Sequence, residues 1–177
     1  MSSLITFLLT LPTPIKYLAS FIVSMIPLIE LRGGVPIGVA IQLPWYKVLP
    51  LCMIGNMIPV PFIFFFARKV LEWGKDKKVI GKVFTFCLEK GEKGGKALTD
   101  KAQKLAKGSD LGLYLALLLF VGIPLPGTGA WTGTLGASIL DLDFKKSIIA
   151  VICGVLLAGT IMTIVSLLGV SAVSAVK

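Results

Sequence analysis

Uncharged stretches that are too short to cross a bilayer alternate with longer ones along this chain. Residues 17–29 and 33–46 are two short uncharged stretches that flank the charged pair Glu30 and Arg32. A transmembrane helix needs roughly 20 apolar residues, and neither stretch reaches that length. Because proline and glycine crowd this region, we expect a re-entrant hairpin that enters and leaves the membrane by the same face, with its turn at residues 30–34.

Residues 48–67 form the first stretch that is long enough to span a membrane. Asn56, Pro59 and Pro61 lie inside this stretch, and they predict a kink because a proline removes a hydrogen bond from the helix. Trp45 precedes the stretch, at a position typical of the aromatic belt at a membrane interface.

The same order of features returns in the second half of the chain. The uncharged arm at residues 111–123 is again short, and it leads into a proline- and glycine-rich segment at residues 124–129. A second arm follows, and residues 147–176 contain the last spanning helix. The predicted fold is therefore an all-α integral membrane protein with two repeats, each a re-entrant helical hairpin followed by a spanning helix.

Charge decides how these segments are oriented. Apolar residues make up 55% of the chain and charged residues 15%, and most of the net charge of +9 lies in residues 68–107. A basic segment between hydrophobic stretches is typical of the cytoplasmic side of a membrane protein, which argues against a nucleic-acid partner and favours the plasma membrane. The two repeats then have inverted topology, an arrangement typical of secondary transporters.

The chain is predicted to be one membrane domain with four parts. These parts are an N-terminal interfacial helix at residues 1–19, the first repeat at 20–71, a basic amphipathic cytoplasmic segment at 72–107, and the second repeat at 108–177. Within the basic segment, we expect two amphipathic helices separated by Gly91, Gly94 and Gly95. This segment is either a solvated anchor on anionic headgroups or a specific lipid or partner site.

Several kinds of chemistry are excluded by residue type. The chain has no histidine, so it lacks a histidine general base and a histidine metal ligand. Its three cysteines, Cys52, Cys87 and Cys153, are far apart and form no metal-binding or disulfide pattern. We therefore expect no metal, no cofactor and no enzymatic activity.

Glu30 and Arg32 are the only charged residues between Lys16 and Lys47. A charge within the bilayer costs about 2.5–3.5 kcal/mol on insertion scales. Two charged residues this close together therefore require a structural or a functional explanation. One interpretation is a structural ion pair. The other is a functional site, in which Glu30 binds a proton or a cation and Arg32 binds an anionic headgroup such as phosphate.

Uncharged residues complete the candidate site. Gly33 and Gly34 either leave backbone N–H groups free to face an anion or allow tight packing, and the small residues of the second turn are equally suited to close packing. The uncharged candidates for substrate binding and proton coupling are Gly33, Gly34, Asn56, Pro124, Pro126, Gly127, Thr128, Gly129, Trp131 and Thr132.

Two motifs at these residues resemble a known family. ELRGGVPIG at residues 30–38 and PLPGTGAWTGTLGA at residues 124–137 resemble the two signature stretches of the small multidrug export protein family, which is similar to the wider DedA/VTT membrane superfamily. The resemblance implies opposed re-entrant hairpins and proton-motive-force-dependent transport of drugs or polyprenyl-phosphate lipid carriers. The acidic residue near the first hairpin of DedA-like proteins would correspond to Glu30. The second hairpin of those proteins carries a Gly-Arg motif, but the matching stretch of this chain has no arginine.

Three functions remain open on this basis. The first is a proton-coupled transporter or flippase, the second is a passive channel or lipid scramblase, and the third is a membrane scaffold that recruits a partner through its lysines. The expected partners are membrane lipids, protons and a small amphipathic or lipid-phosphate substrate. We also expect a homodimer, because two short hairpins in one chain leave broken backbone that needs cover.

Overall fold

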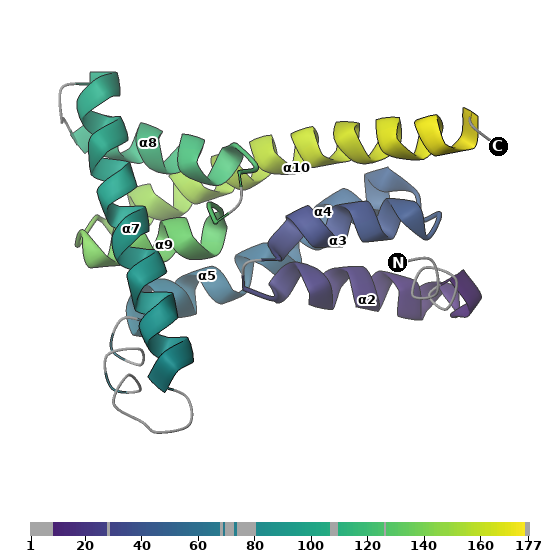
Figure 1. The fold of residues 1–177 in the computed structure, drawn as a ribbon, viewed down its shortest axis with the longest axis horizontal. Helices are drawn as coiled ribbons and strands as arrows, with labels where there is room; N and C mark the ends of the chain where they lie inside the picture. The colour runs from purple at the N-terminus through teal and green to yellow at the C-terminus, as the bar shows by residue number, and fades with distance from the viewer. Residues whose placement is uncertain are drawn as a thin grey trace.

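The computed structural model describes residues 9–27, 29–67, 69, 73, 81–106, 110–125 and 127–175. These residues form helices and contain no strand, which confirms the all-α prediction (Figure 1). The helices are α2 (Thr13–Met25), α3 (Glu30–Ala40), α4 (Trp45–Met57), α5 (Pro59–Phe62), the π-helix η1 (Ile63–Ala67), α7 (Gly81–Ala106), α8 (Asp110–Gly122), α9 (Ala130–Ile139) and α10 (Phe144–Ala175).

Two of the described helices are long and apolar enough to cross a membrane, as the sequence predicts. They are Trp45–Phe66, which comprises α4, α5 and most of η1, and Phe144–Ala172 in α10. The bent pair of α7 and α8 would add a third only if it is counted as one span. The first candidate span is interrupted at Ile58, directly before Pro59, because proline has no N–H to donate within the helix.

The first hairpin turns between the end of α2 at Met25 and the start of α3 at Glu30, so the predicted turn at residues 30–34 is wrong. Ile26 ends α2 in an extended conformation, as expected for a residue that precedes a proline. Residues 30–34 instead form the start of α3. Glycine is accommodated there because a Cβ atom on Gly34 would lie 2.8 Å from the Ser20 carbonyl oxygen of α2, so the two helices pack closely.

The first helix of this hairpin also begins earlier than predicted. It starts at Thr13, with Pro14 in the first turn, where the fixed φ of proline favours a helix. The predicted boundary between residues 19 and 20 therefore falls inside α2. Residues 1–8 of the predicted interfacial helix lie outside the described residues.

The second hairpin turns where the sequence predicts. Helix α8 ends at Gly122 and α9 begins at Ala130, so residues 123–129 connect them; this connection is called the second linker below. Pro126 lies outside the described residues. Helix α10 begins shortly after α9, and Asp143 Oδ1 accepts the Lys146 N–H at 2.9 Å, a typical N-terminal cap.

Helix α7 is continuous, and the predicted division into two amphipathic helices is wrong. It runs through Gly91, Gly94 and Gly95 without a break. Each glycine costs a helix up to about 1 kcal/mol relative to alanine, but here the missing side chains allow two backbones to meet. A Cβ atom on Gly136 of α9 would lie 2.8 Å from the backbone nitrogen of Gly95. Helix α7 therefore crosses over α8 and α9 at close range (Figure 1).

One hydrophobic core joins the two halves of the chain. Its buried side chains come from both hairpins, both candidate spans and α7, and include Leu31, Cys52, Leu98, Leu117 and Val155. In Figure 1, α2 and α3 lie on the right, α8 and α9 lie on the left, and α10 packs against both α3 and α8. The turns of the two hairpins consequently meet near the middle of the molecule.

Candidate functional site

The carboxylate of Glu30 crosses from the first hairpin to the start of α9. Glu30 is only 4% exposed. Its Oε2 accepts the backbone N–H of Ala130 at 3.1 Å, and its Oε1 accepts the N–H of Trp131 at 2.8 Å. These N–H groups begin a helix, where they have no partner within the helix and the dipole favours a negative charge. Glu30 therefore caps a helix that lies 100 residues further along the chain.

The residue before α9 has to be glycine for this contact to exist. Gly129 has φ +140° and ψ −177°, a region of backbone space that is essentially restricted to glycine. A Cβ atom on Gly129 would also lie 2.8 Å from Cδ of Glu30 and closer still to Oε2. Both backbone freedom and the absence of a side chain thus let the carboxylate reach the backbone.

The guanidinium of Arg32 binds the other end of the second linker. Its Nη1 donates to the carbonyl oxygen of Leu125. Its Nη2 donates to Thr128 Oγ1 at 2.9 Å and to the Ile123 carbonyl oxygen at 3.4 Å. These two carbonyls follow directly after α8, at the negative end of that helix, which favours a positive charge.

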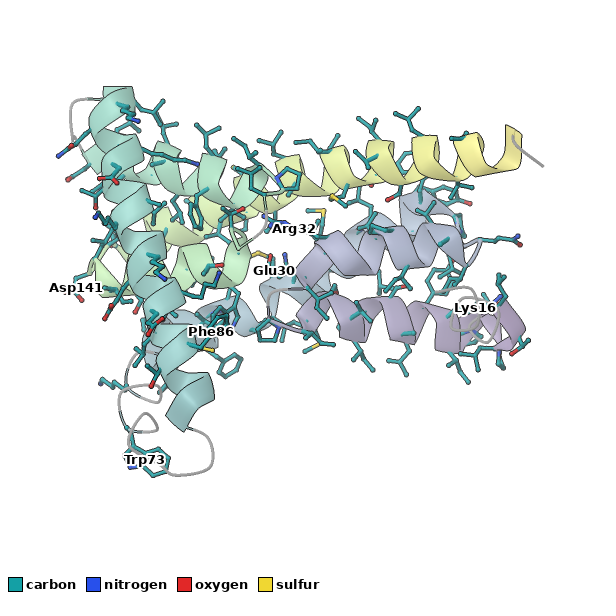
Figure 2. All side chains as sticks on the ribbon, viewed as in Figure 1. Lys16, Glu30, Arg32, Trp73, Phe86 and Asp141 are labelled. Atoms are coloured by element: carbon teal, nitrogen blue, oxygen red, sulfur yellow. The ribbon has the colours of Figure 1, made fainter. Side chains whose placement is uncertain are left out.

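The two charges are arranged to match the two helix ends. Glu30 faces the positive end of α9 and Arg32 faces the negative end of α8, and the two side chains lie close together at the junction of the hairpins (Figure 2). They also interact electrostatically with each other. Hydrogen bonds to charged groups contribute about 1.5–3 kcal/mol each, so this set of bonds offsets much of the cost of burying both charges.

Asn56 adds an unsatisfied polar group to this junction. Its side chain is 3% exposed and lies near the Glu30 carboxylate. Its Nδ2 is buried with no hydrogen-bond partner among the described residues. A buried donor outside hydrogen-bond geometry costs about 1–3 kcal/mol. The Asn56 amide nonetheless interacts with the Glu30 carboxylate, so Asn56 belongs to the same polar junction.

The remaining predicted residues fall into different surroundings. The N–H of Gly33 donates to the Ile29 carbonyl oxygen at 3.2 Å, so it is not free to face an anion. The carbonyl of Thr132 faces α7, 3.0 Å from the position of a Cβ on Gly94. The Trp131 side chain packs against a separate small apolar cluster around Leu135. Pro124 is half-buried and Gly127 is exposed.

Sequence reasoning missed three of the residues that hold the two charges. Ile123, Leu125 and Ala130 contribute only backbone atoms, which every non-proline residue carries in the same form. No residue type marks such a partner in the sequence. The one available signal was the sequence Gly129-Ala130 after a proline-rich segment, which resembles the start of a helix.

The cover that the broken backbone needs is partly supplied within one chain. Glu30 and Gly129 are buried by the opposing hairpin. Leu125 and Gly127 of the second linker remain exposed. Only the exposed part of the second linker therefore still needs cover from a second chain.

A chain whose described residues form helices, two of them apolar and of membrane-spanning length, is an integral membrane protein. Residues 30–161 match a family described as "Putative small multi-drug export protein". Since the match covers most of the chain, the protein belongs to this family, as the two sequence motifs predict. The family indicates a role in export across a membrane. No curated protein and no solved structure matches the chain.

Proposed function

We propose that the protein exports amphipathic molecules in exchange for protons, and that Glu30 is the residue that takes up and releases the proton. The observation that carries this proposal is the pair of hydrogen bonds from the backbone of α9 to the Glu30 carboxylate. A titratable group at the contact between two hairpins links its protonation to their separation.

The physical step is a change in what Glu30 offers to α9. The ionised carboxylate accepts both N–H groups and is attracted by the positive end of the helix. A protonated carboxyl group has lost that charge, and one of its oxygens has become a donor. Protonation therefore weakens the contact between the hairpins, and deprotonation restores it. Asn56, whose Nδ2 has no partner among the described residues, is placed to bind the carboxyl group or the substrate during this change.

The proposal includes a placement in the plasma membrane, with residues 68–107 in the cytoplasm. The two hairpins are re-entrant, they enter from opposite leaflets, and they belong to repeats of inverted topology that are related to the DedA type. The lysines of α7 and the meeting of the two turns beside α10 support this placement (Figure 1). Labelling of single cysteines at the two turns tests it, and turns that are reached from the same side of the membrane contradict it. Cysteine crosslinking at the exposed Leu125 tests the homodimer.

The coupling role is tested with Glu30→Gln in proteoliposomes. Two probes, the cationic dye ethidium and fluorescent phosphatidic acid, are followed with and without a pH gradient. Glutamine keeps the size of the side chain but removes the proton site, so transport of whichever probe the wild-type protein moves should lose its response to the gradient. Glu92→Gln is the matched control, because it makes the same change at an exposed position of α7 and should leave the response intact.

The alternatives give different results in the same assay. A response to the gradient that persists in Glu30→Gln refutes the role of Glu30. Wild-type flux that ignores the gradient identifies a passive channel or scramblase. The absence of any flux favours a scaffold. In that case, neutralising Lys75, Lys77 and Lys78 should impair the protein's function in cells.

A further inference from the structure

A cavity opens where the end of α9 meets η1. Its volume is about 300 Å³, and its lining residues are Phe64, Phe65, Lys69, Ser138, Asp141 and Leu142. Lys69 and Asp141 are exposed, so the cavity is open to the surface. Figure 2 shows Asp141 at the left edge of the molecule and Glu30 near its centre. The cavity and the Glu30 carboxylate therefore lie at opposite ends of the same helix, α9.

Polar residues follow one face of α9 between these two ends. Ala130, whose N–H binds Glu30, is followed at four-residue spacing by Thr134 and then by Ser138. Residues four apart share a face of a helix, on turns that are about 5.4 Å apart. Side chains also tilt toward the N-terminus of their helix, so Thr134 leans toward Glu30 and Ser138 leans toward Thr134. A line of hydroxyl groups thus leads from the cavity toward the carboxylate.

The hydroxyl of Thr134 lacks the hydrogen bond that buried hydroxyls make elsewhere in this fold. Thr163 and Ser166 of α10 each donate to the carbonyl oxygen four residues earlier, and Ser24 of α2 donates to the one three residues earlier. Thr134 is only 1% exposed, yet its Oγ1 has no partner among the described residues, a property that it shares with Ser147 Oγ. Buried polar groups of this kind are the usual ligands of ordered water.

The oxygen of Ser138 is suited to hold a second water. Its hydroxyl donates to the Phe64 carbonyl oxygen of η1 at 2.6 Å, which leaves the lone pairs of the Ser138 oxygen free to accept a hydrogen bond. Two hydrogen bonds of about 2.8 Å each cover the distance of about one helical turn. One water per turn is therefore enough to connect the hydroxyl groups of α9.

We propose that protons pass between Glu30 and this cavity along waters that Thr134 and Ser138 hold in line. This inference rests on the proposed function, in which Glu30 binds the proton, and it adds the route and the side of the membrane. Lys69, at the mouth of the cavity, belongs to residues 68–107, which are cytoplasmic in the placement proposed above. An exporter that works in exchange for protons releases them on this side.

Each step of the release moves one proton between neighbouring oxygens. The protonated Glu30 carboxyl group gives its proton to the water at Thr134, each water passes one proton to the next, and the excess proton leaves the cavity as hydronium. Glu30 is then ionised and accepts the N–H groups of Ala130 and Trp131 again. Uptake is the same sequence in reverse. Thr134 and Ser138 position the waters and keep their own protons throughout.

The rate at which Glu30 is protonated tests this route. The full chain in detergent micelles is exposed to a rapid drop in pH, and infrared spectroscopy follows the carbonyl band of the protonated Glu30 side chain, which Glu30→Gln identifies by removing it. Thr134→Val keeps the size of the side chain but loses one hydrogen bond to water, so the band should appear about tenfold more slowly. Ser138→Ala should slow the band as well, and Thr134→Ser should restore the rate.

Thr163→Val is the matched control. It makes the same change at a buried position of α10, where the hydroxyl donates to the Gly159 carbonyl oxygen at 2.8 Å, away from the route. Its protonation rate should equal that of the wild type. Thermal unfolding shows whether a slow rate has a structural origin, because Thr134→Val removes an unsatisfied buried group and should be at least as stable as the wild type. Equal slowing in the two valine variants overturns the proposal, as does slowing with lower stability that serine does not reverse.

Failure of the route and failure of the proposed function give different results. A Glu30 band that appears at the wild-type rate in Thr134→Val refutes the route and leaves Glu30 in place as the proton site. If the wild-type protein shows no band that Glu30→Gln removes, Glu30 does not bind the proton, and both the proposed coupling role and this inference are refuted.

Discussion

Replacing Gly129 by alanine tests whether the contact between the hairpins depends on a glycine. The substitution has two independent effects. Gly129 has φ +140° and ψ −177°, which an alanine adopts only under strain. The added Cβ would also meet the Glu30 carboxylate, 2.8 Å from its Cδ, so the carboxylate has to move away from α9.

The expected loss of stability follows from these two effects. Backbone strain of this kind costs about 1–3 kcal/mol. A displaced carboxylate loses at least one of its two hydrogen bonds to α9, and each is worth about 1.5–3 kcal/mol. The sum is about 2.5–6 kcal/mol, which is a large part of the 5–15 kcal/mol or so that stabilises a typical protein.

Thermal unfolding of the purified protein in detergent measures this effect. Gly169→Ala is the control, because Gly169 lies in α10 and, among the described residues, no atom beyond its chain neighbours and its own helix backbone lies within 4 Å of the added Cβ. That variant should be as stable as the wild type or more so by up to about 1 kcal/mol, since alanine favours a helix. If Gly129→Ala unfolds at the same temperature as Gly169→Ala, the reasoning about this junction is refuted.

A second substitution separates the two effects. Combining Gly129→Ala with Glu30→Asp shortens the acidic side chain by one methylene group and makes room for the Cβ, but it leaves the backbone strain unchanged. Compared with Glu30→Asp alone, the double variant should therefore lose only about 1–3 kcal/mol. A loss as large as that of Gly129→Ala in the wild-type background would show that strain alone accounts for the effect.

Three further predictions concern the neighbours of this junction. Arg32→Lys should lower stability by about 1–3 kcal/mol in thermal unfolding, because one ammonium group does not reproduce a planar guanidinium that reaches three acceptors; an unchanged unfolding temperature would contradict this. Gly136→Ala should loosen α7 and increase its cleavage by protease, whereas Gly95→Ala, whose Cβ would lie 3.5 Å from the Gly136 carbonyl oxygen, should not; equal cleavage of the two variants would count against the close crossing. Asn56→Leu should preserve or raise stability while it lowers gradient-driven flux, because it removes an unsatisfied buried donor; lower stability with normal flux would identify Asn56 as purely structural.

The elements that depend on local composition could be predicted from the sequence. Uncharged length identified the spans Trp45–Phe66 and Phe144–Ala172 to within a few residues at their starts. The second linker was predicted because prolines and glycines are concentrated there, and both act on the backbone of their own segment. Because a charged side chain within the bilayer is costly, the sequence also indicates that Glu30 and Arg32 have a structural or functional role.

Glycine caused the two wrong predictions. The glycine content predicts a turn at residues 30–34 and a helix break at Gly91, Gly94 and Gly95, yet both segments are helical. The local preference of glycine is against a helix. At these positions, the contact with a second backbone outweighs that preference, and such a contact exists only after folding.

The sequence by itself determined that this chain is a helical membrane protein, that it has two spans of sufficient length, and that Glu30 and Arg32 are out of place in an apolar surrounding. The tertiary structure alone decided what the two charges do. Apart from the Thr128 hydroxyl, their hydrogen-bond partners are backbone groups about 100 residues away, at the ends of α8 and α9. Backbone groups are nearly the same at every residue, so their availability depends on where helices end and meet in space.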